Sequence, residues 1–274
     1  MTASSSASSL AANGSSTLVR LGRLGYASKG VVYVVLGFLA TEAAFHRGGK
    51  TTDTKGAIRT IAEGPFGKLA VVVIVIGLLG YAAWRLVSAA TDAERRGDKP
   101  SSLALRAGEA FRGLAYGSLG LWALKLLMNK PASNGNQTRN IVDKTMGLPG
   151  GKLVVILAGL AFIGYGIYQV YRAVTGKFMK HLDVSGDPKT RDMVENFGRF
   201  GIVARAIVFA MIGFLMVRAG QTYDPAKAGG IAQSLDAISR EPRGHLLFAA
   251  VAVGLIAFGL FQIATAKYRV MRAT

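Results

Sequence analysis

The residues Arg23-Leu24-Gly25, followed by Lys29-Gly30, Tyr33 and Gly37, begin a pattern that occurs three times in this 274-residue chain. The second and third copies keep the same internal spacings. The matching positions are Arg23, Gly25, Lys29, Gly30, Tyr33 and Gly37; Arg106, Gly108, Arg112, Gly113, Tyr116 and Gly120; and Arg199, Gly201, Arg205, Ala206, Phe209 and Gly213. A pattern repeated in register three times predicts three structural repeats of one supersecondary unit.

The composition predicts a membrane protein. Hydrophobic residues make up 51% of the chain, the mean hydropathy is +0.35, and the formal net charge is +18. The apolar residues lie in long runs with the cations beside them, where each cation can gain about 1 kcal/mol from anionic lipid headgroups. We therefore expect anionic headgroups as partners and no nucleic acid. With no cysteine, the chain has neither disulfides nor thiolate metal ligands.

Two apolar runs belong to each repeat, and most approach the roughly 20 residues that a transmembrane helix needs. The six runs are 30–45, 69–90, 113–128, 153–174, 201–217 and 246–266. A single segment that crosses the lipid core can pair all its backbone N–H and C=O groups only by forming an α-helix. We therefore expect all six runs to be transmembrane α-helices. The predicted fold is an all-α integral membrane protein, with three two-helix repeats in parallel orientation and a pseudo-threefold arrangement. The repeats cover 18–94, 103–182 and 193–271, after a disordered tail at 1–16 that is rich in small residues.

The distribution of cations predicts the orientation. The N-terminal segment, the loops 91–112 and 175–205 and the C-terminal segment share one side and carry 17 lysine and arginine residues. The loops 47–68, 129–152 and 219–245 carry 12. By the positive-inside rule, both termini are expected on the cytoplasmic side of the membrane.

A second repeated string precedes each even-numbered apolar run. Its positions are Pro65, Gly67 and Lys68; Pro149, Gly151 and Lys152; and Pro242, Gly244 and His245. Proline suits the first turn of a helix, so we interpret the string as a helix entrance at the membrane surface. The short apolar pattern upstream of each proline predicts a brief helix lying on that surface.

The small residues of the first motif predict a helix–helix interface. Gly30, Tyr33 and Gly37 share one face of a helix, and small residues on one face let membrane helices approach closely. Space for a ligand beside the aromatic residue is the alternative interpretation.

Charged residues also recur at matched positions. Glu42, Lys125 and Arg218 form one such set, and they are candidates either for contact with outer headgroups or for a charged constriction at the repeat axis. Arg85, Gln169 and Gln262 form a set at the inner end. Lys29, Arg112 and Arg205 form a third set, more typical of headgroup or helix-cap contacts than of a substrate site.

The stretch from Arg23 to Tyr33 resembles the opening unit of the bacterial membrane protein family of domain of unknown function 1206. That unit reads Arg-x-Gly-Tyr-Ala-x-Lys/Arg-Gly-x-x-Tyr, and the Gly80-Tyr81 and Trp84-Arg85 pairs resemble its even helices. The second copy departs from the unit at Glu109 and the third at Ile202 and Ala206. The resemblance implies tandem two-span units in a bacterial plasma membrane, of an actinobacterium, and it assigns no activity.

Function is less well determined by the sequence than architecture. No residues at fixed spacing form a catalytic or metal-binding set, so we expect neither an enzyme nor a cofactor. The leading hypothesis is a structural or accessory scaffold that docks a membrane protein partner. The alternative is a transporter or channel for a small solute, ion or lipid that uses Glu42, Lys125 and Arg218.

Overall fold

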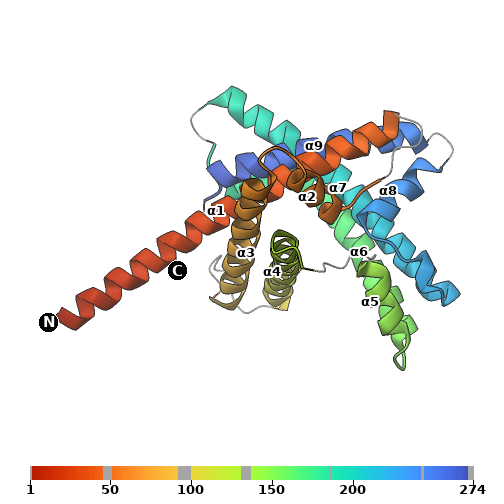
Figure 1. Cartoon of the computed structure of the whole chain (residues 1–274), viewed down its shortest axis with the longest axis horizontal. Helices are drawn as coiled ribbons and strands as arrows, with labels where there is room; N and C mark the ends of the chain where they lie inside the picture. Colours follow the sequence, from red (N-terminus) through yellow and green to blue (C-terminus); the bar gives the residue numbers. More distant parts are fainter. Residues whose placement is uncertain are drawn as a thin grey trace.

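The structure is a computed structural model that describes residues 19–45, 51–91, 102–103, 105–130, 137–184, 187–241 and 244–270. Over these residues it is built from helices joined by turns (Figure 1). They are α1 (Thr2–Phe45), α2 (Thr54–Ala62), α3 (Gly67–Thr91), α4 (Pro100–Leu127), α5 (Gln137–Met146), α6 (Gly151–Val174), η1 (Lys177–His181), α7 (Pro188–Thr222), η2 (Pro225–Lys227), α8 (Ile231–Ser239) and α9 (Gly244–Tyr268). Each repeat thus consists of a long helix, a short helix and a second long helix. The all-helical fold and its repeated order agree with the sequence prediction.

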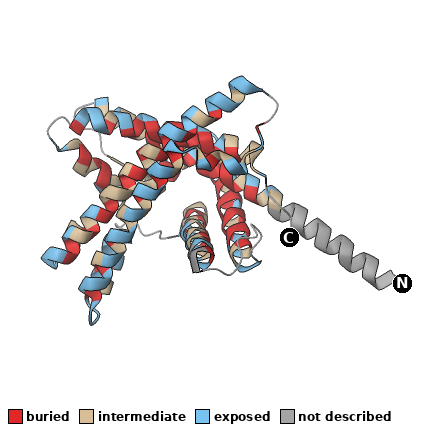
Figure 2. Ribbon diagram, turned by 180° about the vertical axis from the view of Figure 1, so that it is seen from behind, coloured by how far each residue is buried: buried red, intermediate tan, exposed pale blue. Residues whose placement is uncertain are grey.

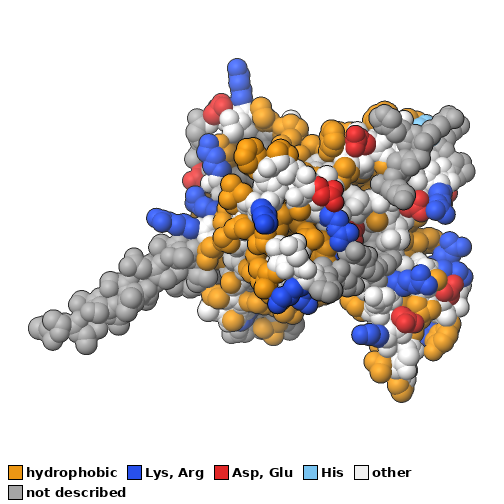
Figure 3. All heavy atoms as spheres, in the orientation of Figure 1, with side chains coloured by type: hydrophobic (Ala, Val, Ile, Leu, Met, Phe, Trp, Pro, Cys, Tyr) orange, Lys and Arg blue, Asp and Glu red, His pale blue; other side chains and the backbone are white. Residues whose placement is uncertain are grey.

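Five helices are long and apolar enough to cross a membrane: α3, α6, α7, α9 and the Val19–Phe45 part of α1. In the described part of the chain, α4 does not meet that standard. Its apolar stretch begins only at Gly113, because Arg106, Glu109 and Arg112 occupy its first half. The structure therefore supports five of the six predicted spans, and the sixth stays a prediction. On the face seen in Figure 3, broad hydrophobic areas lie between scattered cationic side chains.

The predicted disordered tail, residues 1–16, lies outside the residues that the structure describes, so it stays a prediction.

The long helices pack in a sequence that follows the repeats. The second long helix of each repeat packs on the first long helix of the next: α3 on α4, α6 on α7, and α9 on α1. Within repeats, α1 packs on α3 and α7 on α9, whereas α4 and α6 have no comparable interface. Buried residues concentrate where the long helices cross (Figure 2). The predicted pseudo-threefold arrangement is thus incomplete at one position and stays a prediction.

Glycines bring the packed helices into backbone contact. A Cβ on Gly30 of α1 would lie 2.7 Å from the Gly259 carbonyl oxygen of α9, and a Cβ on Gly259 would lie 2.7 Å from the Gly30 carbonyl oxygen. Gly213 of α7 and Gly159 of α6 approach each other in the same way, at 2.5 and 2.7 Å. Such close approach gives membrane helices the van der Waals contact on which their association depends.

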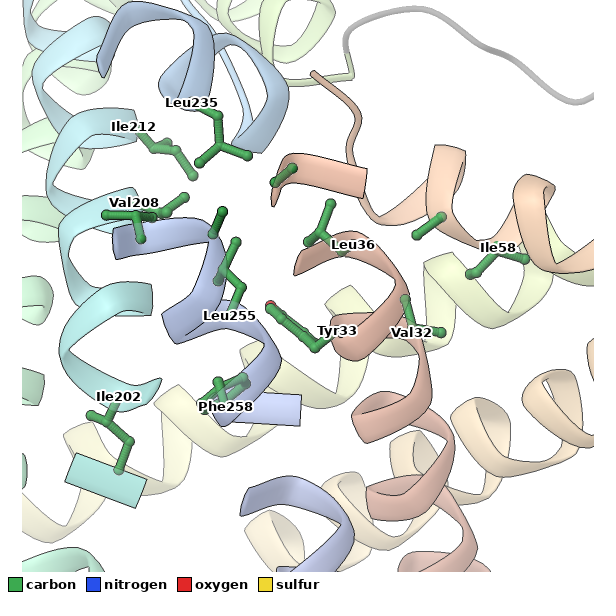
Figure 4. Packing of buried hydrophobic residues seen from close by; sticks show 14 of the residues in the cluster. Val32, Tyr33, Leu36, Ile58, Ile202, Val208, Ile212, Leu235, Leu255 and Phe258 are labelled. Atoms are coloured by element: carbon green, nitrogen blue, oxygen red, sulfur yellow. The ribbon is translucent and has the colours of Figure 1, made fainter. Parts of the chain in front are cut away.

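The short helices α2, α5 and α8 are present where the sequence predicts them. Each is held by apolar side chains that are almost fully buried, such as Ile58 of α2, Val142 of α5 and Leu235 of α8. Figure 4 shows Ile58 and Leu235 at opposite sides of the core that contains Leu36 and Leu255. The side chain of Asp53 caps α2 by accepting from the Gly56 amide at 2.9 Å. Burial of one face explains how such short helices persist.

The second motif differs from the helix-entrance interpretation in one respect. The helices α3, α6 and α9 begin at the glycines Gly67, Gly151 and Gly244, so Pro65 and Pro149 lie in the preceding turn. Pro242 lies outside the described residues. A Cβ on any of the three glycines would come within 2.0 Å of a carbonyl oxygen at the end of the short helix before it. The glycine, more than the proline, lets the short helix meet the long one, while Lys68, Lys152 and His245 are exposed.

We predict that Gly201→Ala destabilises the protein by about 1–3 kcal/mol through overpacking. A Cβ there would lie 2.3 Å from the backbone nitrogen of Phe258. The matched control is Gly164→Ala in α6, where nothing lies within 4 Å and the change should gain helix propensity. Thermal unfolding in detergent measures both. Equal melting temperatures for the two variants would contradict the proposed packing of α7 on α9.

Candidate functional site

The structure places Glu42, Lys125 and Arg218 near the ends of α1, α4 and α7, all with exposed side chains. They do not converge at a packed centre, so the arrangement does not support the predicted charged constriction. The alternative prediction, snorkelling of these side chains to outer headgroups, stays a prediction.

The charged set that does converge is the one assigned to headgroup or cap contacts: Lys29 of α1, Arg112 of α4 and Arg205 of α7. Lys29 is 6% exposed, and Arg112 and Arg205 are half-buried. The headgroup interpretation of this set stays a prediction. A neighbouring motif residue does cap a helix: Arg106 donates to the carbonyl oxygens of Ala89 and Ala90 at the end of α3.

Helical geometry contains a signal that separates the two sets. Glu42, Lys125 and Arg218 each follow the cation of the same helix by 13 positions. Thirteen residues turn an α-helix by about 220° beyond three full turns and advance it by about 20 Å. The two sets therefore lie on different faces and at different depths, and only one of them can face the centre.

The ammonium of Lys29 is surrounded by aromatic rings. Its nitrogen lies 4.8 Å from the ring centre of Tyr116, 5.4 Å from that of Phe258 and 5.7 Å from that of Tyr81. These rings come from α4, α9 and α3. Among the described residues, none provides a hydrogen-bond acceptor for this ammonium. Ring faces attract a cation by roughly 0.5–2 kcal/mol each, but they do not replace the hydrogen bonds that an ammonium makes in water.

Arg205 links α7 to α1 and α9. Its Nε donates to the Tyr33 hydroxyl at 3.3 Å, and its guanidinium carbon lies 4.2 Å from the ring centre of Phe209 and 5.0 Å from that of Phe258. Tyr33 and Phe258 also meet edge to face, with ring centres 4.9 Å apart (Figure 4). Arg205 thus shares the Phe258 ring with Lys29.

A buried ion pair lies next to these cations. The Arg85 guanidinium donates from Nη1 to Oε1 of Glu109 at 3.0 Å, and both side chains are at most 5% exposed. It also donates to the hydroxyls of Tyr81 and Tyr26. Glu109 corresponds to Tyr26 and Ile202 in the other repeats, so the departure of the second copy supplies the counterion for Arg85. The paired departures of Arg85 and Glu109 from their repeats are a sequence signal for this contact.

The centre therefore has an excess of positive charge. Arg85 has Glu109, but no described carboxylate pairs with Lys29, Arg112 or Arg205. Lys29 and Arg205 both contact the Phe258 ring, and Arg112 lies one helical turn before Tyr116, whose ring contacts Lys29. Arg112 makes one local hydrogen bond, from Nε to the Gly108 carbonyl oxygen at 3.0 Å, and its other donors are available. The cluster offers donors without acceptors, which is the chemistry of an anion-binding site.

Comparisons with known proteins agree with the repeat structure. The family described as Domain of Unknown Function (DUF1206) matches the chain three times, at residues 24–92, 107–176 and 200–269. A protein of Bacillus subtilis (strain 168), described as "Uncharacterized protein YxxB", is 33% identical over 253 residues, which are 92% of this chain and 91% of that protein. No solved structure matches the chain.

We predict that Glu109→Gln lowers the free energy of unfolding by about 3 kcal/mol, because it leaves the buried Arg85 without its carboxylate. The control is Glu195→Gln, which removes the exposed i,i+4 pair with Arg199 at 2.6 Å and should cost at most about 0.5 kcal/mol. Chemical or thermal unfolding in detergent compares the two. A Glu109 variant as stable as the control would show that the pair does not hold α3 to α4.

Proposed function

This chain belongs to the DUF1206 family, and we propose that it is an integral membrane protein that binds an anion at its centre and thereby carries or passes anionic solutes or lipids. One observation carries the proposal: Lys29, Arg112 and Arg205 occupy the same position of three repeats and meet inside the helix bundle without carboxylate partners. We name these three residues the central cations.

The energetic argument rests on the cost of buried charge. Removing one ion from water costs several kcal/mol even after the protein relaxes around it. For Lys29, three aromatic rings recover a comparable amount at most, and repulsion from neighbouring arginines adds to the cost. An anion among the central cations offsets both the cost of removing Lys29 from water and the repulsion between the cations. Charged groups retained inside a membrane protein typically serve a ligand or ion pathway.

We propose that α4 is the sixth span and that the six long helices follow a pseudo-threefold plan, open between α4 and α6. The membrane is a bacterial plasma membrane, with both termini in the cytoplasm. Lys29 lies 16 residues from Phe45, the last residue of α1, which corresponds to about 24 Å along the helix. In a hydrocarbon core about 30 Å thick, this depth places the central cations near the cytoplasmic surface.

The scaffold hypothesis stays a prediction, and so does the absence of enzymatic activity. A scaffold would have a stable stoichiometric partner protein. The anion-binding proposal differs from the earlier transport hypothesis in its residues, because it uses the central cations in place of Glu42, Lys125 and Arg218.

We predict that Lys29→Met leaves the protein at least as stable as the wild type without added anion, because methionine fills similar volume without a charge to desolvate. Glycerol 3-phosphate, at constant ionic strength, should raise the melting temperature of the wild type. At 100 times its dissociation constant, the ligand should raise the free energy of unfolding by about 2.7 kcal/mol. Lys29→Met should lose most of this response, and the exposed control Lys68→Met should keep it. A full response from Lys29→Met would contradict the proposed site.

The sixth span is tested by labelling, which the cysteine-free sequence makes simple. We predict that single cysteines introduced as Thr52→Cys and Lys130→Cys react with a membrane-impermeant maleimide outside intact cells, whereas Lys177→Cys reacts only after permeabilisation. If α4 did not cross the membrane, Lys130→Cys would be protected and Lys177→Cys would react outside.

A further inference from the structure

We propose further that the anion is the phosphate-containing headgroup of an anionic phospholipid, seated among the central cations, with its acyl chains leaving the protein between α4 and α6. This inference rests on the proposed anion-binding function and names the class of its ligand. It is argued from the missing helix interface, from the cations on its two sides and from their depth in the membrane.

The first observation is the missing interface itself. In the first and third repeats the two long helices pack together, whereas α4 and α6 of the second repeat do not. As a result, 22% of the apolar stretch of α6 is buried, compared with 50 to 56% in the other four spans. The described part of the bundle is therefore open to the lipid phase along one side, and the other five neighbour positions are occupied by packed helices.

The second observation is that cations stand on both sides of this opening. Arg112 lies on α4 and Arg172 on α6, the two helices that border the opening, and both side chains are half-buried. Arg172 donates from Nη1 to Oε1 of Gln169 at 3.2 Å, and it has no carboxylate partner among the described residues. The opening thus leads from apolar helix surfaces to Arg112 and Arg172, with Lys29 and Arg205 deeper inside.

The third observation is the buried ammonium of Lys29. It is more than nine-tenths buried and has no hydrogen-bond partner among the described residues. A phosphate group has several strong acceptor oxygens, and guanidinium groups bind it through paired donors. An ammonium acts as a point charge toward the same group. One phosphate can therefore use both kinds of donor at this site.

The membrane setting selects a lipid over a free anion. The charged end of the opening lies at the level of the cytoplasmic leaflet, where anionic lipids are enriched. Along α6, the exposed side chains near the opening are apolar, as at Leu157 and Ala161. A small soluble anion would use only the charged end. An amphiphile matches both the charged end and the apolar surfaces beside it.

Ala161 is the position from which the opening can be blocked. Ala161, Tyr165 and Arg172 are spaced at i, i+4 and i+11, so they share one face of α6. Ala161 is exposed, so a tryptophan there adds bulk beside the opening without entering a packed interface. Ile167, exposed on another face of the same helix, provides the matched control.

The experiment uses the full chain in nanodiscs of phosphatidylcholine with and without phosphatidylglycerol, followed by detergent exchange and mass spectrometry of the retained lipid. The wild type and Ile167→Trp should retain about one phosphatidylglycerol per chain and little phosphatidylcholine. Ala161→Trp and Arg172→Gln should retain at least tenfold less phosphatidylglycerol. In detergent, Ala161→Trp should keep the rise in melting temperature with glycerol 3-phosphate, because that probe needs no acyl-chain exit.

The outcomes separate this inference from the proposed function. If phosphatidylglycerol is retained no better than phosphatidylcholine, or equally by the wild type and Ala161→Trp, the lipid assignment is overturned while a response to glycerol 3-phosphate keeps the anion site. If neither phosphatidylglycerol nor glycerol 3-phosphate binds the wild type, the anion site itself is overturned.

Discussion

A charge held inside a membrane protein needs compensation from its surroundings, and the ammonium of Lys29 has aromatic rings alone among the described residues. The backbone contact of Gly30 with Gly259 brings α1 against α9, and Lys29 is buried within the bundle. The rings of Tyr116, Tyr81 and Phe258 then lie 4.8 to 5.7 Å from its nitrogen. Rings stabilise a cation but cannot accept hydrogen bonds as water does. The need for an anion at the centre follows from this imbalance.

The repeats share a plan, and the second repeat departs from it in a coordinated way. Glu109 stands where the other copies have Tyr26 and Ile202. It pairs with Arg85, which fixes α4 to α3 of the preceding repeat. The same repeat lacks packing between its own long helices, α4 and α6. The ion pair therefore holds α4 on the far side of the opening without requiring contact with α6. These two departures of the second repeat make the central site asymmetric, although the three repeats share one plan.

Much of the fold could be predicted from the sequence because it depends on periodicity. The three-copy motif fixed the repeats, the apolar runs located the spans, and the short pattern before Pro65 predicted α2. The site was harder, because identical spacing does not say which face of a helix is central. Lys29 and Glu42 both recur in register, and the 13-residue step between them was the clue that their faces differ. The ring partners of Lys29 and the missing α4–α6 interface are properties of three-dimensional packing that no single stretch encodes.

The most direct test of the central claim is an experimental structure of the full chain in nanodiscs that contain phosphatidylglycerol. We expect headgroup density within hydrogen-bonding distance of the Lys29 ammonium and of the Arg112 and Arg205 guanidinium groups, with acyl-chain density continuing between α4 and α6. Density for neither headgroup nor other anion at the central cations, with the Lys29 ammonium satisfied by protein groups or water, would contradict the account.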